Sequence, residues 1–185
     1  MFSGQIKRIT SNMAIALLYQ RQISNVDFNF LIKKLKKTFS SKVSLQALDG
    51  LPLSSFNERR GQYYSTGVLN YLIEKLANYQ RALTILDIDL YVPYLSFVFG
   101  EADLVNKKAV VSISRLKPKY SQGQSNAKLL TDRLVKEAVH ELGHTYKLNH
   151  CREEKCVMSF SSNLVKVDNK SSDFCFDCKR LILEL

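Results

Sequence analysis

All the histidines and cysteines of this chain, the residues that bind zinc most often, are gathered in one stretch. The three histidines and four cysteines lie between residues 140 and 178, in HELGHTYKLNHCREEKC and in a later CFDC. The part that follows the last histidine, residues 151–185, has only 35 residues. A segment below roughly 40 residues usually needs a metal or disulfides to fold. The C-terminal part must therefore fold around its cysteines.

The histidines predict a catalytic zinc site. On a helix, His140 and His144 lie one turn apart on the same face, so both imidazoles can reach one Zn²⁺ at about 2.0–2.1 Å. His150 supplies a third neutral ligand after a turn and leaves the fourth position open for water. Glu141 can then accept a proton from a zinc-bound water and deliver it to the leaving amine. HExxH also occurs by chance in helices whose histidines only pack in a core, and the third histidine favours the catalytic interpretation.

The four cysteines predict a second, structural zinc site. Two pairs, the second of them a CxxC, suit a tetrahedral Cys₄ site with Zn–S near 2.3 Å; they are Cys151, Cys156, Cys175 and Cys178. The alternatives are disulfides or a redox-active CxxC, but no thioredoxin-like βαβ pattern surrounds the second pair. Neighbouring residues in an extended chain point to opposite sides, so His150 can face one metal and Cys151 the other.

The hydrophobic pattern predicts strands alternating with helices, and hence a mainly parallel sheet. The polar segment 49–61 reads as a loop, and a late pair of β-rich runs predicts one antiparallel edge strand. The expected strands are 13–19, 43–48, 82–90, 96–103 and 107–116, and the expected helices are 27–39, 62–79 and 127–145.

Composition and charge exclude some classes of protein. The formal charge of +10 fits a surface that attracts acidic partners. The lysines of residues 32–37, however, share a helix with an apolar face and carry no recognised nucleic-acid motif, so we interpret them as a solvated helix face. No apolar run reaches the roughly 18 residues that cross a bilayer, and no signal peptide pattern is evident. We therefore expect a cytoplasmic monomer with reduced thiols, without membrane contact.

The motif HELGHTYKLNH resembles the metzincin metallopeptidase motif HExxHxxGxxH, and the continuation CREEKCVM with the later CFDC resembles the archaemetzincin signature. Upstream segments RRGQY, ILDIDLYVPYLSFVFGEA and VVSISRL are similar to the same family. The resemblance implies an α/β fold with a mixed five-stranded sheet, an active-site helix and a small C-terminal subdomain. It divides the chain into an extension (1–12), a catalytic subdomain (13–150) and a Cys₄ zinc subdomain (151–185).

The resemblance also implies a function. It implies a zinc metallopeptidase that cleaves peptide or protein substrates with two zinc ions, one catalytic and one structural, and it places Met158 in a Met-turn beneath the catalytic metal. The edge strand would bind the substrate backbone by strand addition through Phe97, Val98, Phe99 and Gly100. The rival hypothesis is a zinc-stabilised binding protein without catalysis, for nucleic acid given the charge.

One residue departs from the family motif. Lys147 stands where the family has glycine, which turns the chain through a left-handed conformation toward the third histidine. Lysine in that conformation costs about 1 kcal/mol, which a metal site can offset. The alternative is a rebuilt turn in which Asn149 takes the left-handed conformation. No tyrosine follows Tyr146, so the sequence names no oxyanion-stabilising group besides zinc.

Overall fold

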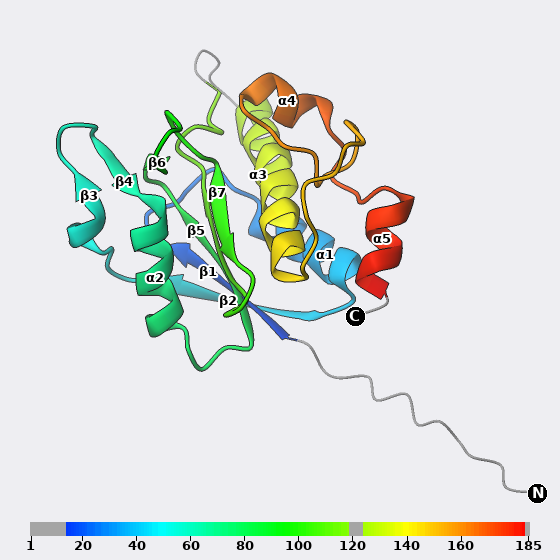
Figure 1. The fold of residues 1–185 in the computed structure, drawn as a ribbon, viewed down its shortest axis with the longest axis horizontal. Helices are drawn as coiled ribbons and strands as arrows, with labels where there is room; N and C mark the ends of the chain where they lie inside the picture. The colour runs from blue at the N-terminus through cyan, green and yellow to red at the C-terminus, as the bar shows by residue number, and fades with distance from the viewer. Residues whose placement is uncertain (1–13, 119–123, 184–185) are drawn as a thin grey trace, which may run out of the picture.

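A central five-stranded sheet organises the computed structural model, which describes residues 14–118 and 124–183 (Figure 1). The strand order is β2-β1-β5-β8-β7, and only β7 runs antiparallel to its neighbour. The strands are β1 (Ala14–Gln20), β2 (Lys42–Leu48), β5 (Arg81–Leu86), β8 (Lys108–Ser112) and β7 (Gly100–Asp103). This is the mixed, mainly parallel sheet with an antiparallel edge strand that the sequence predicts. The expected extension 1–12 lies outside the described residues.

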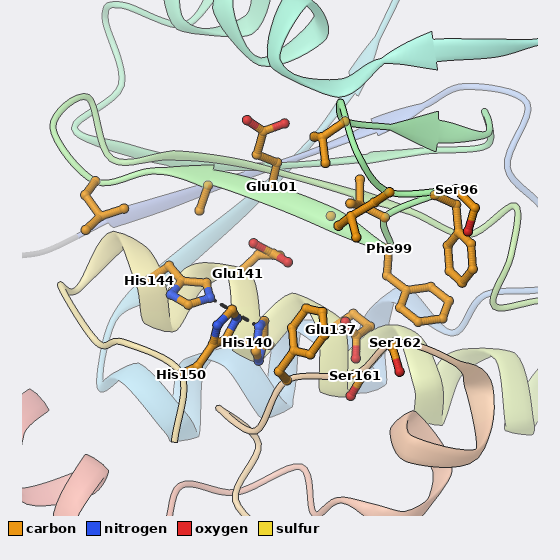
Figure 2. A pocket seen from close by; sticks show the side chains of 18 residues that line it. Ser96, Phe99, Glu101, Glu137, His140, Glu141, His144, His150, Ser161 and Ser162 are labelled. Carbon is orange, nitrogen blue, oxygen red and sulfur yellow. Dashed lines mark hydrogen bonds between the residues drawn. The ribbon is translucent and has the colours of Figure 1, made fainter. Parts of the chain in front are cut away.

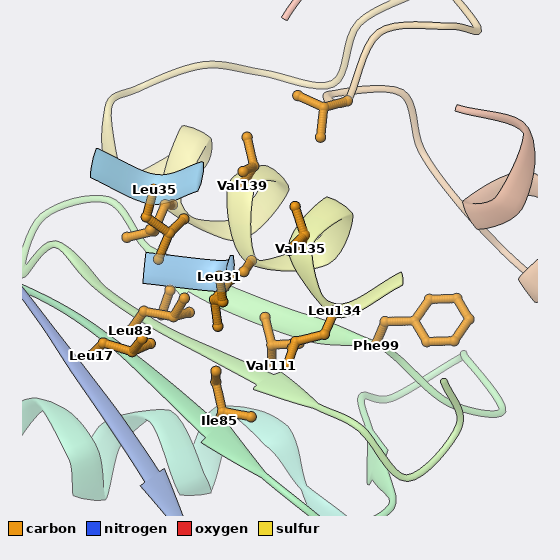
Figure 3. Packing of buried hydrophobic residues seen from close by; sticks show 14 of the residues in the cluster. Leu17, Leu31, Leu35, Leu83, Ile85, Phe99, Val111, Leu134, Val135 and Val139 are labelled. Carbon is orange, nitrogen blue, oxygen red and sulfur yellow. The ribbon is translucent and has the colours of Figure 1, made fainter. Parts of the chain in front are cut away.

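Helices cover both faces of the sheet because the strand residues alternate between the two sides. On one face, α1 (Phe28–Phe39) and α3 (Gln124–Thr145) pack on the sheet; on the other, α2 (Ser65–Lys75) does. Leu17 and Leu83 belong to the first core, whereas their neighbours Leu18 and Ala82 belong to the second. Figure 3 shows the first core, in which strand residues meet α1 and α3.

The lysine-rich stretch is a solvated helix face. Leu31 and Leu35 of α1 are fully buried, while Lys33, Lys36 and Lys37 are exposed on the opposite side of the helix. The predicted amphipathic helix is confirmed.

The structure corrects several predicted boundaries. Residues 62–64 are not helical: they form β4 (Gln62–Tyr64), which pairs with β3 (Phe56–Asn57) and β6 (Leu90–Tyr91) in a second, small sheet. The predicted loop 49–61 contains β3 and a 3₁₀ turn, η1 (Leu53–Ser55). The predicted strand 82–90 is divided between β5 and β6, and the edge strand begins only at Gly100.

The C-terminal segment packs against the helices of the first core. It carries α4 (Leu164–Asn169) and α5 (Phe176–Leu183), neither of which the sequence analysis predicted. Arg133 of α3 donates two hydrogen bonds of 2.7 Å to the carboxylate of Asp168, and Lys34 of α1 forms a 2.7 Å ion pair with Asp173. Val167 and Cys178 are buried in the same cluster as the α1 and α3 residues. Among the described residues, no helix combines the length and apolarity needed to span a bilayer.

Candidate metal centres and the catalytic cleft

The last turn of α3 ends in a motif that brings the three histidines together. The helix ends at Thr145, and Lys147 just beyond it has a left-handed φ of 62°, as predicted for a lysine in the place of glycine. Its backbone N–H donates to the His144 carbonyl at 2.7 Å, and the Leu148 N–H donates to the Gly143 carbonyl at 3.2 Å. These two bonds define a Schellman motif, which normally has glycine at the left-handed position. Asn149 is not among the described residues with positive φ, so the alternative turn is wrong.

An arginine from the sheet fixes the same helix end. Arg81, the first residue of β5, donates to the Thr145 carbonyl at 2.5 Å, and its guanidinium lies 3.5 Å from the centre of the Tyr146 ring. A buried cation at the C-terminus of a helix satisfies terminal carbonyls and complements the helix dipole. The turn that carries His150 therefore starts from a rigid helix end.

Backbone carbonyls orient two of the three imidazoles. His140 Nδ1 lies 2.8 Å from the Val157 carbonyl oxygen, and His144 Nδ1 lies 2.8 Å from the Leu148 carbonyl oxygen. A carbonyl only accepts, so Nδ1 carries the proton in both rings and Nε2 keeps its lone pair. Metal-binding histidines are usually fixed in this way.

The three imidazoles fit one tetrahedral zinc ion. One nitrogen from each of His140, His144 and His150 lies within 4.8 Å of the others, and the two helix histidines approach to 3.2 Å between their Nε2 atoms (Figure 2). Zinc bound at about 2.0–2.1 Å in tetrahedral geometry separates two nitrogens by roughly 3.3–3.4 Å. Burial lowers the pKa of all three imidazoles, and the positive charge of Lys170 lowers the pKa of His140 and His150 further. The histidines are therefore neutral, as metal ligands must be.

Glu141 lies between the histidines and the edge strand, with its carboxylate in van der Waals contact with Gly100. A Cβ at position 100 would lie 2.7 Å from Glu141 Cγ and 2.9 Å from Glu141 Oε1. Glu141 is 6% exposed, and burial, followed by the negative charge of Glu137, raises the pKa of its carboxyl well above the usual value. A carboxylate held next to a metal site in a dry environment is a stronger proton acceptor than one in water.

The cleft in front of the histidines has a volume of about 470 Å³. The three histidines and Glu141 line one wall, and β7 with the chain that leads into it lines the opposite wall. β7 ends the sheet, so its outer edge has no strand partner among the described residues.

The predicted substrate-binding residues all line this cleft, but only one of them belongs to the edge strand. Gly100 is the first residue of β7, whereas Phe97, Val98 and Phe99 precede it. Val98 forms an isolated bridge with Leu90, to whose carbonyl its N–H donates at 2.9 Å. Backbone pairing with a substrate would therefore have to use β7 itself.

The four cysteines form a second cluster. Their sulfur atoms lie within 4.8 Å of one another, all four are free thiols, and the Sγ atoms of Cys151 and Cys175 are 3.8 Å apart. A disulfide requires about 2.05 Å, whereas two thiolates on a tetrahedral zinc at about 2.3 Å lie roughly 3.8 Å apart. The backbone N–H groups of Glu153 and Cys175 point to Cys151 Sγ and Cys156 Sγ at 3.4 and 3.3 Å. The arrangement fits a closed Cys₄ site and excludes a disulfide within it.

A backbone hydrogen bond and a β-bridge hold the segment shared by the two clusters. Cys151 donates its N–H to the Met158 carbonyl at 2.9 Å, and Cys151 forms a parallel bridge with Ser159. The side chain of His150 belongs to the histidine cluster, while that of the next residue belongs to the cysteine cluster. Met158 is fully buried and packs against Gly143 of α3, where a Cβ would collide with its sulfur.

Several polar residues in and beside the cleft were not predicted from the sequence, among them Glu137, Lys170 and Ser161. Glu137 is 3% exposed and lines the cleft, one turn before Glu141 on the same helix face. Lys170, at the end of α4, lies 2.9 Å from Glu137 Oε1, and its side chain is 0% exposed. Ser161 also lines the cleft. The i, i+4 spacing could have revealed Glu137, but no local pattern signals Lys170 or Ser161.

Three features together define a zinc metallopeptidase of the metzincin type. They are a mixed sheet with an antiparallel edge strand, an HExxH helix that faces this strand, and a third histidine after a left-handed turn. Comparison with known sequences identifies the family, because the profile of peptidase family M54 matches residues 12–184. The chain belongs to peptidase family M54, the archaemetzincins.

Individual relatives agree with this assignment. An archaemetzincin from Methanopyrus kandleri is 43% identical over 132 residues, which are 71% of this chain and 72% of that protein. One from Methanocaldococcus jannaschii is 36% identical over 168 residues, 90% of each chain. The crystal structure of the Methanopyrus kandleri archaemetzincin superposes with a TM-score of 0.82 at 33% identity, covering 97% of this chain and 98% of that one. A zinc-dependent peptidase from Methanocorpusculum labreanum superposes with a TM-score of 0.81 at 27% identity, covering 91% and 99%.

Proposed function

We propose that this chain hydrolyses peptide bonds at the histidine cluster, with His140, His144 and His150 as zinc ligands and Glu141 as the general base. The observation that carries the proposal is the mutual placement of the three imidazole nitrogens, all within 4.8 Å, with Glu141 between them and β7. Zinc, when bound, polarises the scissile carbonyl and lowers the pKa of a water molecule toward about 7. The remaining steps fall to the protein's own side chains.

Glu141 moves the proton. Its carboxylate takes a proton from the attacking water and transfers it to the nitrogen of the leaving amine as the peptide bond breaks. The contact with Gly100 limits the positions that this carboxylate can take. The burial of Glu141 keeps bulk water from most of its carboxylate, which strengthens its electrostatic interactions with the transition state.

The outer edge of β7 aligns the substrate. An extended peptide pairs its backbone N–H and C=O groups with the unpaired groups of this strand, as in strand addition. The scissile bond then lies between β7 and the histidines. Peptides or proteins with an accessible extended segment are the substrates that this geometry can bind.

The cysteine cluster holds a second zinc ion with a structural role, and Met158 forms the Met-turn under the catalytic site. A structural zinc ties residues 151–156 to residues 175–178, and the adjacent His150 is fixed with them. Residues 151–185 then act as a zinc-stabilised subdomain. We expect the chain to act as a monomer.

The test is metal analysis combined with digestion of a peptide library. We expect two zinc ions per chain and cleavage products that disappear when the histidine site is emptied. The rival hypothesis of a non-catalytic binding protein predicts a loaded histidine site without cleavage of any peptide. Lys147 keeps the left-handed turn despite lacking the glycine, so its replacement is no sign of a decayed site.

A further inference from the structure

A network of polar side chains lies behind one wall of the cleft. The part of the wall concerned is residues 95–97, hereafter the wall segment, all three of which line the cleft. Figure 2 shows Ser96 and the nearby Phe99 across the cleft from Ser161 and Ser162. None of the side chains in the network lines the cleft itself; they are Arg60, Gln62, Asp89 and Arg115.

The wall segment has little regular structure of its own. Residues 92–97 belong to no helix or strand, and a bond of 3.2 Å from the Leu95 N–H to the Val92 carbonyl closes the turn that starts them. Tyr94, within this turn, has a left-handed φ of 72° and a fully exposed side chain, so it does not stabilise the turn. Pairing with another strand resumes at Val98. The groups that hold the wall segment must therefore come from other parts of the chain.

Arg60 and Gln62 hold the backbone of the wall segment. Arg60 Nη2 donates to the carbonyls of Leu95 and Ser96, at 3.1 Å in each case. Gln62, the first residue of β4, is buried, and its Nε2 donates to the same Ser96 carbonyl at 2.9 Å. Arg60 Nε donates to Gln62 Oε1 at 2.9 Å, so the two side chains also fix each other. The arginine is held in turn by the ring of Tyr91, whose centre lies 4.2 Å from its guanidinium.

Asp89 and Arg115 extend the network to the third residue of the wall segment. Gln62 Nε2 lies 3.2 Å from Asp89 Oδ2, to which it also donates. Arg115 donates two hydrogen bonds of 2.6 Å to the same carboxylate, and its guanidinium lies 4.5 Å from the centre of the Phe97 ring. The network thus contacts two carbonyls and one ring of the wall segment, all from outside the cleft.

This network also gives a structural meaning to the three upstream segments that resemble the archaemetzincins. RRGQY contains Arg60 and Gln62, ILDIDLYVPYLSFVFGEA contains Asp89 and the wall segment, and VVSISRL contains Arg115. None of the three segments contains a histidine or a cysteine, so metal binding does not account for them. They are distant in the chain and meet at one place, behind the wall segment.

We propose that Arg60 and Gln62 are positioning residues for substrate binding, which hold the wall segment in the form that a peptide requires. The inference rests on the proposed function, because it concerns the same cleft. Neither side chain lines the cleft, so both act through the backbone of Leu95 and Ser96 and not by contact with the substrate. A wall that takes its binding form for only a fraction of the time lowers the apparent affinity in proportion to that fraction.

Arg60→Ala tests the positioning role. Residue 60 is exposed, so the variant should fold and keep the zinc content of the parent protein. We expect KM to rise about fivefold and kcat to change by less than about twofold, the pattern of a loss in substrate binding. Arg59→Ala is the matched control, because it removes the same charge from an exposed neighbour that makes none of these contacts. An unchanged KM in Arg60→Ala, or an equal rise in Arg59→Ala, overturns the proposal.

Arg60→Lys separates hydrogen bonding from charge. Lysine keeps the positive charge, but its single nitrogen cannot bind Gln62 and both carbonyls in the fixed geometry of a guanidinium. We expect a KM between those of the parent and Arg60→Ala. A parental KM in Arg60→Lys overturns the proposal, because charge alone would then be sufficient.

Two further measurements do not depend on turnover. A phosphinic hexapeptide, whose phosphinate replaces the scissile bond, extends to both sides of the metal, whereas acetohydroxamate has only a metal-binding group. We expect Arg60→Ala in the zinc-loaded full chain to weaken binding of the hexapeptide about fivefold and to leave that of acetohydroxamate unchanged, as measured by calorimetry. Hydrogen exchange at the amides around Val98 should become about tenfold faster. Equal weakening of both compounds, or unchanged exchange, overturns the proposal.

Digestion of a peptide library with the parent protein distinguishes this inference from the proposed function. Cleavage of peptides with an unchanged KM in Arg60→Ala contradicts the positioning role and leaves the peptidase mechanism intact. Selective weakening of the hexapeptide in Arg60→Ala, with no peptide cleaved by the parent, supports the positioning role and contradicts the mechanism.

Discussion

Gly100 and Glu141 are in direct contact across the catalytic cleft, with no space for a side chain at position 100. A Cβ there would lie 2.7 Å from Glu141 Cγ and 2.5 Å from the carbonyl oxygen of Val110 on the neighbouring strand. The backbone of the edge strand thus forms the surface on which the proposed general base rests. Glycine at position 100 is therefore needed for two reasons: a side chain there would collide with Glu141 in the site and with the backbone of β8 in the sheet.

Gly100→Ala should therefore lower kcat. The new methyl group must displace the Glu141 carboxylate, and a displacement near 1 Å at a reacting group can cost about 100-fold in rate. We expect kcat to fall by about 10- to 100-fold, with a smaller change in KM, at a temperature where the variant is folded by circular dichroism. The shorter Glu141→Asp provides a double-mutant cycle: if the methyl acts through residue 141, its effect should shrink in the aspartate background. Additive losses would contradict the steric account.

Glu141→Gln should remove hydrolysis while both metals stay bound. The amide keeps the shape of the side chain beside Gly100 but cannot take a proton, and removal of a general base typically costs about 10²–10⁴-fold. Metal content by mass spectrometry and turnover on a cleaved peptide are the two measurements. His150→Ala is the contrasting variant, because it should lose zinc from the histidine site as well as activity. Parental turnover in Glu141→Gln would remove Glu141 from the mechanism.

The two metal sites should differ in their response to a chelator. The proposed histidine site would have three protein ligands and lines the cleft, whereas the proposed cysteine site would have four, two of them buried. We expect a mild chelator to remove one zinc ion without loss of secondary structure, and removal of the second to expose residues 151–183 to protease. Zinc release measured with a colorimetric indicator, in parallel with limited proteolysis, would show the order. A protein that contains one zinc ion, or that unfolds with the loss of the first, would contradict the assignment.

Gly143→Ala should disturb the floor of the histidine site. A Cβ at this position would collide with the sulfur of Met158, which is fully buried, and would lie 3.3 Å from Phe174, which is partly buried. Overpacking of this kind costs about 1–3 kcal/mol, so we expect a lower melting temperature and weaker binding of the first zinc ion. Gly67→Ala is the control, because its Cβ would meet the Ser55 side chain, which can rotate away. Equal stability of the two variants would contradict a tight contact between Met158 and α3.

The main sheet and the grouping of the histidines and of the cysteines could be predicted from the sequence because their signals are local. Strand residues such as Leu17 and Leu83 lie in apolar runs that alternate with helical patterns, and ligands such as His140 and His144 are close in the chain. The small sheet could not be predicted in this way. Its strands have two or three residues each, and β4 is extended because Tyr63 and Tyr64 pair with the distant β6.

The positions of Glu137, Lys170 and Ser161 in and beside the cleft could not be predicted for a related reason. Glu137 and Lys170 meet only after α4 has packed on α3, and Ser161 lies twenty residues beyond Glu141 in the chain although both line the cleft. Such placement depends on tertiary structure, and the sequence carries no local pattern for it. Conversely, the left-handed lysine was predictable, because Lys147 stands at the position where the family motif has the glycine that turns the chain toward the third histidine.

Lys147→Gly should stabilise the protein. Lys147 has φ of 62°, a conformation that costs a residue with a Cβ about 1–2 kcal/mol and costs glycine almost nothing. Glycine also loses more conformational entropy on folding, which offsets part of the gain. We expect a net stabilisation of up to about 1 kcal/mol and a melting temperature up to about 4 °C higher, with zinc binding at least as tight. The control is Lys33→Gly on the exposed face of α1, which should destabilise by about 0.5–1 kcal/mol because that residue is in an ordinary helical conformation. Similar destabilisation by both substitutions, in metal-loaded and metal-stripped protein alike, would show that the turn bears no strain at Lys147.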